Sequence, residues 1–166
     1  FLNLDEKMEP GVAQRIHSII ETEDLGDRIH IFSPRDLPQS GAGSHILPNI
    51  IKTAKVFLTM SVVEGCGMAA CEAAASGIPV IGTEHIPVVT DTIAPAGGGT
   101  VVRGKDIRAA ADAVLYYLSL DHDEWQEVAD KAYNSVIPRF TWSNIVADMF
   151  RQMKAKGIDL LSPLGL

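Results

Sequence analysis

The stretch KVFLTMSVVEGCGMAACEAAASGIPVIGT, residues 55–83, decides the fold. It opens with an apolar run, KVFLTM (55–60), and closes with a second one, GIPVIGT (77–83), and both are typical of buried strands. Between them, two glycines lead into an alanine-rich segment that favours a helix. Two buried strands joined through a helix predict a parallel pair.

The same alternation of strands and helices extends on both sides of this stretch. We expect further strands at RIHIF (28–32) and GGGTVV (97–102), with helices near 10–25, 46–54, 107–118 and 123–136 and from 141 onward. The sequence therefore predicts an α/β fold, a Rossmann-like three-layer sandwich with a parallel sheet covered on both faces. No internal repeat and no domain boundary is expected.

The C-terminal helices have predicted inward faces and caps. Asp121 followed by Glu124 predicts a capping box, and Trp142 after Thr141 predicts a capped helix with a buried aromatic anchor. The expected core face of the helix at 107–118 consists of Ile107, Ala110, Ala111, Val114, Leu115 and Leu118.

Composition excludes several classes of function. The 166 residues are 46% hydrophobic, which fits one globular domain with a core of its own. A net charge of -7, without clustered Lys or Arg, argues against nucleic acid and anionic membrane as partners. No apolar run reaches the roughly 20 residues of a membrane span. We expect no metal, because no H-x3-H spacing occurs and the Asp121-x-Asp123 of DHDE (121–124) is interpreted as part of the capping box. Two cysteines so close in sequence fit a reducing, cytoplasmic location.

The glycine turn at Gly65 and Gly67 predicts a ligand site. In an open α/β sheet, the end of a strand and the start of the next helix border the usual ligand crevice. The free N–H groups of a first helical turn favour an anion, and glycines let a ligand approach the backbone closely. A phosphate-bearing ligand is therefore expected.

Glu64 and Glu72 flank this turn, eight positions apart. If both lay on one helix, they would be separated by roughly 12 Å along its axis and by about 80° of rotation. The carboxylates of glycosidases lie about 5 to 9.5 Å apart, so this spacing disfavours an acid/base pair. It fits better a ligand laid along the helix start and held at both ends.

Other interpretations remain open from the residues alone. Both glutamates could be solvated helix carboxylates, with Glu64 merely favouring the helix N-terminus. GCGMAA (65–70) also matches G-x-G-x-x-A, and Glu84 stands 17 residues past Gly67, which is the pattern of an NAD(P)-binding oxidoreductase domain. A non-catalytic interaction domain is the third class. His85 follows a strand end at the same crevice and is interpreted as a loop histidine.

EGCGMAACE (64–72) has the form E-x7-E, and with GIPVIGT (77–83) it resembles the donor-binding C-terminal domain of glycosyltransferase family 4, retaining enzymes of the GT-B fold. RIHIFSPRD (28–36) and RFTWSNIVADMF (139–150) are similar to further elements of that family, and the resemblance extends from about residue 10 to 156. Cys66 stands where the family often has Phe, and Val88 stands where it has Glu.

The resemblance implies one half of a GT-B enzyme that transfers a sugar, with retention, from a UDP-, GDP- or ADP-linked donor to an acceptor, without a cofactor. A glycoside phosphorylase or a trehalose-type disaccharide synthase would have the same motifs. In the implied site, Glu64 contacts the donor sugar as the catalytic carboxylate, and Glu72 accepts hydrogen bonds from the ribose. The remaining implied donor contacts are backbone at Gly65, Gly67, Met68 and Ala69 along sugar and diphosphate, and at Ser33 and Pro34 beside the base.

The chain begins at Phe1, which predicts that residues 1–166 are a fragment, the nucleotide-sugar-binding C-terminal domain. By the resemblance, the acceptor-binding N-terminal domain and the Arg and Lys that neutralise the departing diphosphate precede it. We expect such a fragment to bind a nucleotide sugar weakly without turning it over.

Overall fold

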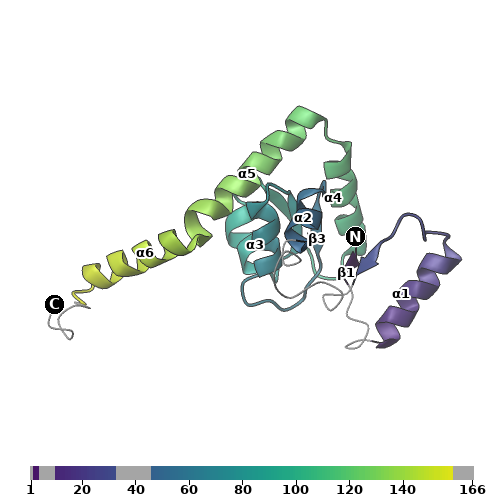
Figure 1. Cartoon of the computed structure of the whole chain (residues 1–166), viewed down its shortest axis with the longest axis horizontal. Coiled ribbons are helices and arrows are strands. Elements are labelled where there is room, and N and C mark those ends of the chain that lie inside the picture. The colour runs from purple at the N-terminus through teal and green to yellow at the C-terminus, as the bar shows by residue number, and fades with distance from the viewer. Residues whose placement is uncertain (1, 4–9, 33–45, 159–166) are drawn as a thin grey trace. The chain divides into compact units, whose positions relative to one another are not determined.

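The computed structural model describes residues 2–3, 10–32 and 46–158 (Figure 1). The chain divides into two compact units, residues 1–49 and 50–166, and each is described by itself. No boundary at this point was expected from the sequence, because the short helix α2 (Ile46–Lys52) spans it without a change in composition.

The first unit is a small strand–helix–strand motif. Strand β1 (Leu2–Asn3) pairs in parallel with β2 (Ile31–Phe32), and α1 (Pro10–Thr22) lies between them in sequence. Pro10 occupies the first helical position, where its fixed φ and missing N–H cost nothing. The second strand is shorter than the predicted 28–32, and β1 was not predicted.

The second unit is built on a parallel sheet, as predicted. Strands β3 (Phe57–Thr59), β4 (Val80–Thr83) and β5 (Gly99–Val102) lie in the order β3-β4-β5. Leu58 pairs with Ile81, and Gly82 pairs with Val101. All four residues of β4 are buried, which explains its continuous apolar sequence.

Helices cover both faces of this sheet, so the three-layer α/β prediction is confirmed. On one face, α4 (Ile107–Ser119) packs over Ile81 and Val102 through Ala110 and Tyr117. The Tyr117 hydroxyl lies 2.8 Å from the Thr100 hydroxyl, which gives the buried tyrosine a hydrogen-bond partner. On the other face lie α3 (Met68–Ala75), α5 (His122–Phe140) and the short π-helix η3 (Val89–Ile93), which pack against one another.

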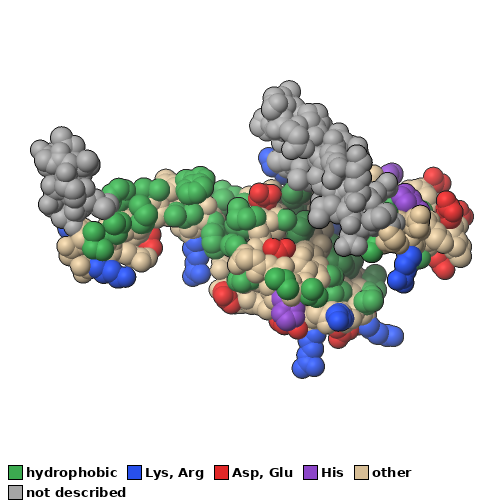
Figure 2. All heavy atoms as spheres, turned by 90° about the horizontal axis from the view of Figure 1, so that it is seen from below, with side chains coloured by type: hydrophobic (Ala, Val, Ile, Leu, Met, Phe, Trp, Pro, Cys, Tyr) green, Lys and Arg blue, Asp and Glu red, His purple; other side chains and the backbone are tan. Residues whose placement is uncertain are grey.

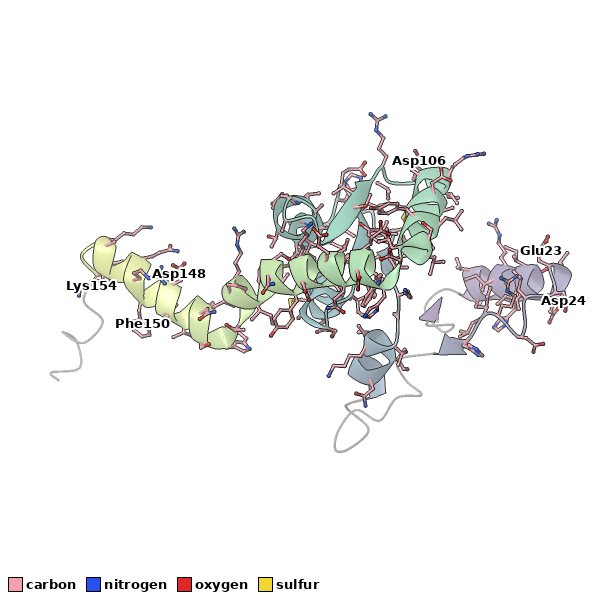
Figure 3. The ribbon with its side chains drawn as sticks, turned by 90° about the horizontal axis from the view of Figure 1, so that it is seen from above. Glu23, Asp24, Asp106, Asp148, Phe150 and Lys154 are labelled. Carbon is pink, nitrogen blue, oxygen red and sulfur yellow. The ribbon has the colours of Figure 1, made fainter. Side chains whose placement is uncertain are left out.

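The predicted inward face of α4 is partly wrong. Ile107, Leu115 and Leu118 are 80%, 63% and 52% exposed. The helix instead turns Ala110 and Tyr117 to the sheet, with partly buried Ala109, Ala113 and Val114 beside them. The narrow alanines let the helix approach closely, and the Tyr117 ring fills the remaining space. Asp106 caps its start by accepting from Ala109 N at 3.0 Å (Figure 3).

Helix α5 begins with the predicted capping box. Asp121 accepts from Glu124 N at 2.9 Å, and the Glu124 carboxylate accepts from Asp121 N at 3.2 Å. The helix continues through Pro138 to Phe140, four residues beyond the predicted end. At its start, Trp125 Nε1 donates to the Lys55 carbonyl at 2.7 Å.

Helix α6 (Trp142–Ala155) differs from its prediction. Trp142 is 81% exposed and Thr141 makes no side-chain cap bond, so neither the anchor nor the cap is formed. Within α6, all of which the structure describes, no residue is buried. Hydrophobic side chains gather along it in Figure 2, and Phe150 extends away from the helix in Figure 3. The exposed large hydrophobic residues of α6 are Trp142, Ile145, Val146, Met149 and Phe150.

Two features between β4 and β5 were not predicted. The first is helix η3, in which Ala94 N donates to the Val89 carbonyl at 3.0 Å, the hydrogen bond between residues five apart that defines a π-helix. Gly98 fits against α5 so closely that a Cβ there would lie 2.4 Å from Ala132 Cα. The expected glycine turn at 97–99 is therefore also a packing contact.

Within the described ranges, no helix is long and apolar enough to cross a membrane. The same residues contain no group of three or more His, Cys, Asp or Glu arranged to hold a metal ion.

Candidate functional site

The candidate site lies where β3 ends and α3 begins. β3 ends at Thr59, an irregular segment follows, and the helix starts only at Met68. We call residues 61–67 the donor loop, after the ligand that the family resemblance implies for this segment. Glu64 therefore lies four residues before the helix. The expected separation of roughly 12 Å assumed that both glutamates lie on one helix. That assumption is wrong, because only Glu72 lies in α3 and the helical rise does not apply to Glu64.

Gly67 makes the sharp entry to α3. Its φ of 92° lies in the left-handed region, where side chains other than glycine are strained. A Cβ there would lie 2.4 Å from Ile86 Cγ2, and Ile86 is fully buried. Both conformation and space therefore require glycine at position 67.

The N-terminus of α3 has no side-chain cap bond, since its N-cap residue is Gly67. The first intrahelical bond of the helix runs from Cys71 N to the Gly67 carbonyl at 3.0 Å. The preceding amides at Met68 and Ala69 belong to the first turn, whose N–H groups have no partner within a helix. This end of α3 provides a partial positive charge and directed donors for an anion.

The predicted residues of α3 lie on one face. Met68, Ala69 and Glu72 are exposed and neighbours at helical spacing, whereas Ala70 and Ala73 are buried against the core. The structure thus brings the predicted helix residues together on the open side of α3.

The other predicted residues have three different outcomes. Glu64 is exposed in the donor loop. Gly65 lies beside it, and a Cβ added there would meet nothing within 4 Å, so open space borders this backbone. Ser33 and Pro34 lie outside the described residues.

The last residue of β4 and the segment that follows it hold the donor loop at both of its ends. The Thr83 hydroxyl donates to the Ser61 carbonyl at 2.5 Å, and Val88 N donates to the Cys66 carbonyl at 3.1 Å. With Ile86 against Gly67, the segment 83–88 supports the donor loop at its start and at its end. Sequence reasoning missed this support, because these bonds join residues 22 positions apart.

The two cysteines have unlike surroundings. Cys71 is buried in α3, and burial raises the pKa of its thiol, with the nearby Cys66 and Glu72 adding to the rise. Cys66 lies in the donor loop and is partly exposed. Both thiols are free.

Glu84, the residue after β4, is hydrogen-bonded to the segment that follows β5. Its carboxylate accepts from Gly104 N at 2.6 Å, and His85 Nε2 lies 3.5 Å from its other oxygen. The pKa of Glu84 is lowered, first by its own backbone N–H and then by Gly104 N–H and the charges of His85 and Arg103, against a partial desolvation. This carboxylate therefore already has protein partners where the dinucleotide interpretation needs it to bind a ribose.

Known proteins match most of the chain. A family model described as Glycosyl transferases group 1 matches residues 13–135. "Probable sucrose-phosphate synthase 5" of Oryza sativa subsp. japonica is 30% identical over 140 residues, which are 82% of this chain and 13% of that protein. "Putative colanic acid biosynthesis glycosyltransferase WcaL" of Salmonella typhimurium is 29% identical over 135 residues, 76% of this chain and 31% of the relative. The chain thus spans a third or less of these curated relatives.

Among solved structures, sucrose-phosphate synthase from Thermosynechococcus elongatus superposes with a TM-score of 0.66 at 25% identity, over 86% of this chain and 34% of that one. Two others share the fold and contain a bound nucleotide. They are a mutant of S. aureus TarM in complex with UDP (TM-score 0.64, 20% identity, 84% and 26% coverage) and Starch Synthase IV from Arabidopsis thaliana bound to ADP (0.59, 18%, 90% and 30%).

The family model covers far more than half of the chain, and the parallel sheet with its two helical layers matches one part of GT-B structures. The chain therefore belongs to Glycosyl transferases group 1, glycosyltransferase family 4, whose retaining enzymes have the GT-B fold.

Proposed function

We propose that this chain is the donor-binding domain of a retaining glycosyltransferase that transfers a sugar from a UDP-, GDP- or ADP-linked donor to an acceptor. The observation that carries the proposal is the uncapped N-terminus of α3, placed between two exposed glutamates in a chain of this family. An anion-binding end with an acceptor on each side fits a ligand that has a diphosphate between two hydroxyl-rich groups.

In this proposal, Glu72 accepts hydrogen bonds from the ribose hydroxyls. Its position on the open face of α3, one turn beyond Met68, suits a group next to the diphosphate. Glu64, in the donor loop, accepts from hydroxyls of the donor sugar and is the catalytic carboxylate. A carboxylate that accepts two hydroxyl donors forms charge-assisted bonds, which are stronger than neutral ones.

The amides of Gly67, Met68 and Ala69 are proposed to lie along the sugar and diphosphate. As the glycosidic bond to the diphosphate breaks, negative charge grows on the departing phosphate oxygens. Fixed N–H donors and the helix dipole stabilise that charge without having to reorganise. Gly65, with open space beside its backbone, allows the donor to approach the donor loop.

Calorimetric titration with UDP, GDP and ADP tests the nucleotide half of the proposal. We expect one of the three to bind and Glu72→Ala to weaken it about tenfold to a hundredfold, the range for hydrogen bonds to a charged group. The matched control is Glu127→Ala, an exposed helical glutamate on α5, which should leave binding unchanged. Binding of NAD instead would support an oxidoreductase domain, and no nucleotide binding would support an interaction domain.

A transfer assay tests the catalytic half. We expect the 166-residue chain alone to bind a nucleotide sugar without transferring it. Transfer to an added acceptor by this chain would show that it needs no further charged groups for the departing diphosphate.

A further inference from the structure

We infer that Thr83 is a positioning residue for donor-sugar recognition, acting through the backbone of the donor loop. This inference rests on the proposed function, because it assigns the sugar end of the donor to that loop. Thr83 has no contact with the donor in the proposal. It fixes the position of Glu64 indirectly, through its hydrogen bond to the backbone of the donor loop.

The Thr83 side chain is unusual for its polarity and burial. It is 0% exposed, at the last position of β4. A buried hydroxyl requires hydrogen-bond partners, and this one has two on different segments. It donates to the Ser61 carbonyl at 2.5 Å and accepts from His85 N at 3.3 Å.

The bond to Ser61 fixes the start of the donor loop. Ser61 is three residues before Glu64, and the next tether along the chain is the bond from Val88 N to the Cys66 carbonyl, two residues after it. Glu64 therefore stands in a short span between two attachments to the segment 83–88. Releasing one attachment lets that span move, whereas Glu72 stays fixed in α3.

The two halves of the donor should consequently depend on Thr83 to different degrees. The nucleotide is held by α3, which is built on its own hydrogen bonds and its packing against α5. The sugar is held by the donor loop, which depends on the tether. Loss of the Thr83 hydroxyl should therefore reduce the contribution of the sugar to the binding affinity and leave the contribution of the nucleotide unchanged.

The test compares the affinities of the chain for UDP, GDP and ADP with those for UDP-glucose, GDP-mannose and ADP-glucose. Thr83→Val keeps the shape of the side chain and removes its hydroxyl. We expect the ratio of nucleotide-sugar to nucleotide affinity to fall about twofold to tenfold, the effect of one net hydrogen bond. Thr83→Ser, which keeps the hydroxyl, should restore the ratio.

Thr92→Val is the matched control. Thr92 is a 9% exposed threonine on η3 in the same unit, away from the donor loop in sequence and on another element. The same substitution there should leave the ratio unchanged. An equal loss of affinity for nucleotide and nucleotide sugar in Thr83→Val would overturn the inference and assign Thr83 a general structural role.

Hydrogen exchange of the free chain makes the tether testable without a ligand. Amides of residues 62–66 should exchange about twofold to tenfold faster in Thr83→Val than in the parent. Unchanged exchange would overturn the inference even if nucleotides bind. If the parent binds no nucleotide, the proposed function fails and the inference falls with it, while faster exchange would still establish the structural tether by itself.

Discussion

Gly67→Ala should lower the stability of the chain strongly, whereas Gly65→Ala, two residues away in the donor loop, should leave it nearly unchanged. Alanine at 67 would have to adopt a φ near 92°, which costs about 1–2 kcal/mol in the left-handed region. Its methyl would also lie 2.4 Å from Ile86 Cγ2 and 3.1 Å from Val88 Cγ1. Both neighbours are buried and cannot swing aside, so overpacking adds about 1–3 kcal/mol.

The sum for Gly67→Ala is about 2–5 kcal/mol of unfolding free energy. For a chain of this size it corresponds to a fall in Tm of about 4–20 °C. Gly65→Ala should change the unfolding free energy by less than about 0.5 kcal/mol, because its methyl meets nothing within 4 Å. Urea unfolding followed by far-UV circular dichroism measures both.

Equal losses in the two variants would refute this reasoning, and so would a Gly67→Ala variant as stable as the parent. The first result would mean that the donor loop packs against something at Gly65. The second would mean that Ile86 can move at no cost. Gly65→Ala also gives a folded variant whose only change is a methyl group facing the proposed donor.

Substitutions at three further positions test the scaffold. Gly98→Ala should cost about 1–3 kcal/mol in urea unfolding, because its methyl would meet the Ala132 backbone at 2.4 Å. Asp121→Ala should cost about 0.5–2 kcal/mol by removing the capping box of α5, whereas Asp121→Ser should recover most of it. The pKa of Glu84 is lower in the folded chain than its ordinary value of 4.5, so its ionised carboxylate stabilises the fold at pH values above 4.5. This stabilisation is lost as the pH falls through the lower pKa of the folded chain. Glu84→Gln should therefore show a smaller loss of Tm on acidification than the parent, and equal acid profiles would contradict the bond to Gly104.

The parallel sheet was predictable because its strands are continuous apolar runs. A strand buried on both faces shows this pattern however the helices are placed, and β4 is such a strand. The turn at Gly67 was predictable as well, because a glycine between a strand and a helix marks a sharp change of direction. The capping box at Asp121 is a local signal, and it is confirmed.

The predictions that failed concern features that depend on contacts between segments distant in sequence. The apolar side chains of α4 lie on two sides of the helix, and the side that faces the sheet contains Tyr117, whose hydroxyl is hydrogen-bonded to that of Thr100, 17 positions away. Trp142 was expected to be buried from its residue type alone, but nothing in the described structure covers it. The role of Thr83 has no pattern in the sequence at all, since a single threonine at a strand end is indistinguishable from any other.

The unlike surroundings of the two cysteines give the chain a built-in attachment point for a probe. Thiolates are the form that reacts readily with maleimides, and burial both raises the pKa of the Cys71 thiol and keeps it out of reach of the reagent. A fluorophore should consequently attach at Cys66, within the donor loop, without any substitution in a chain that has only two cysteines. Movements of that loop could then be followed as fluorescence changes in the natural sequence.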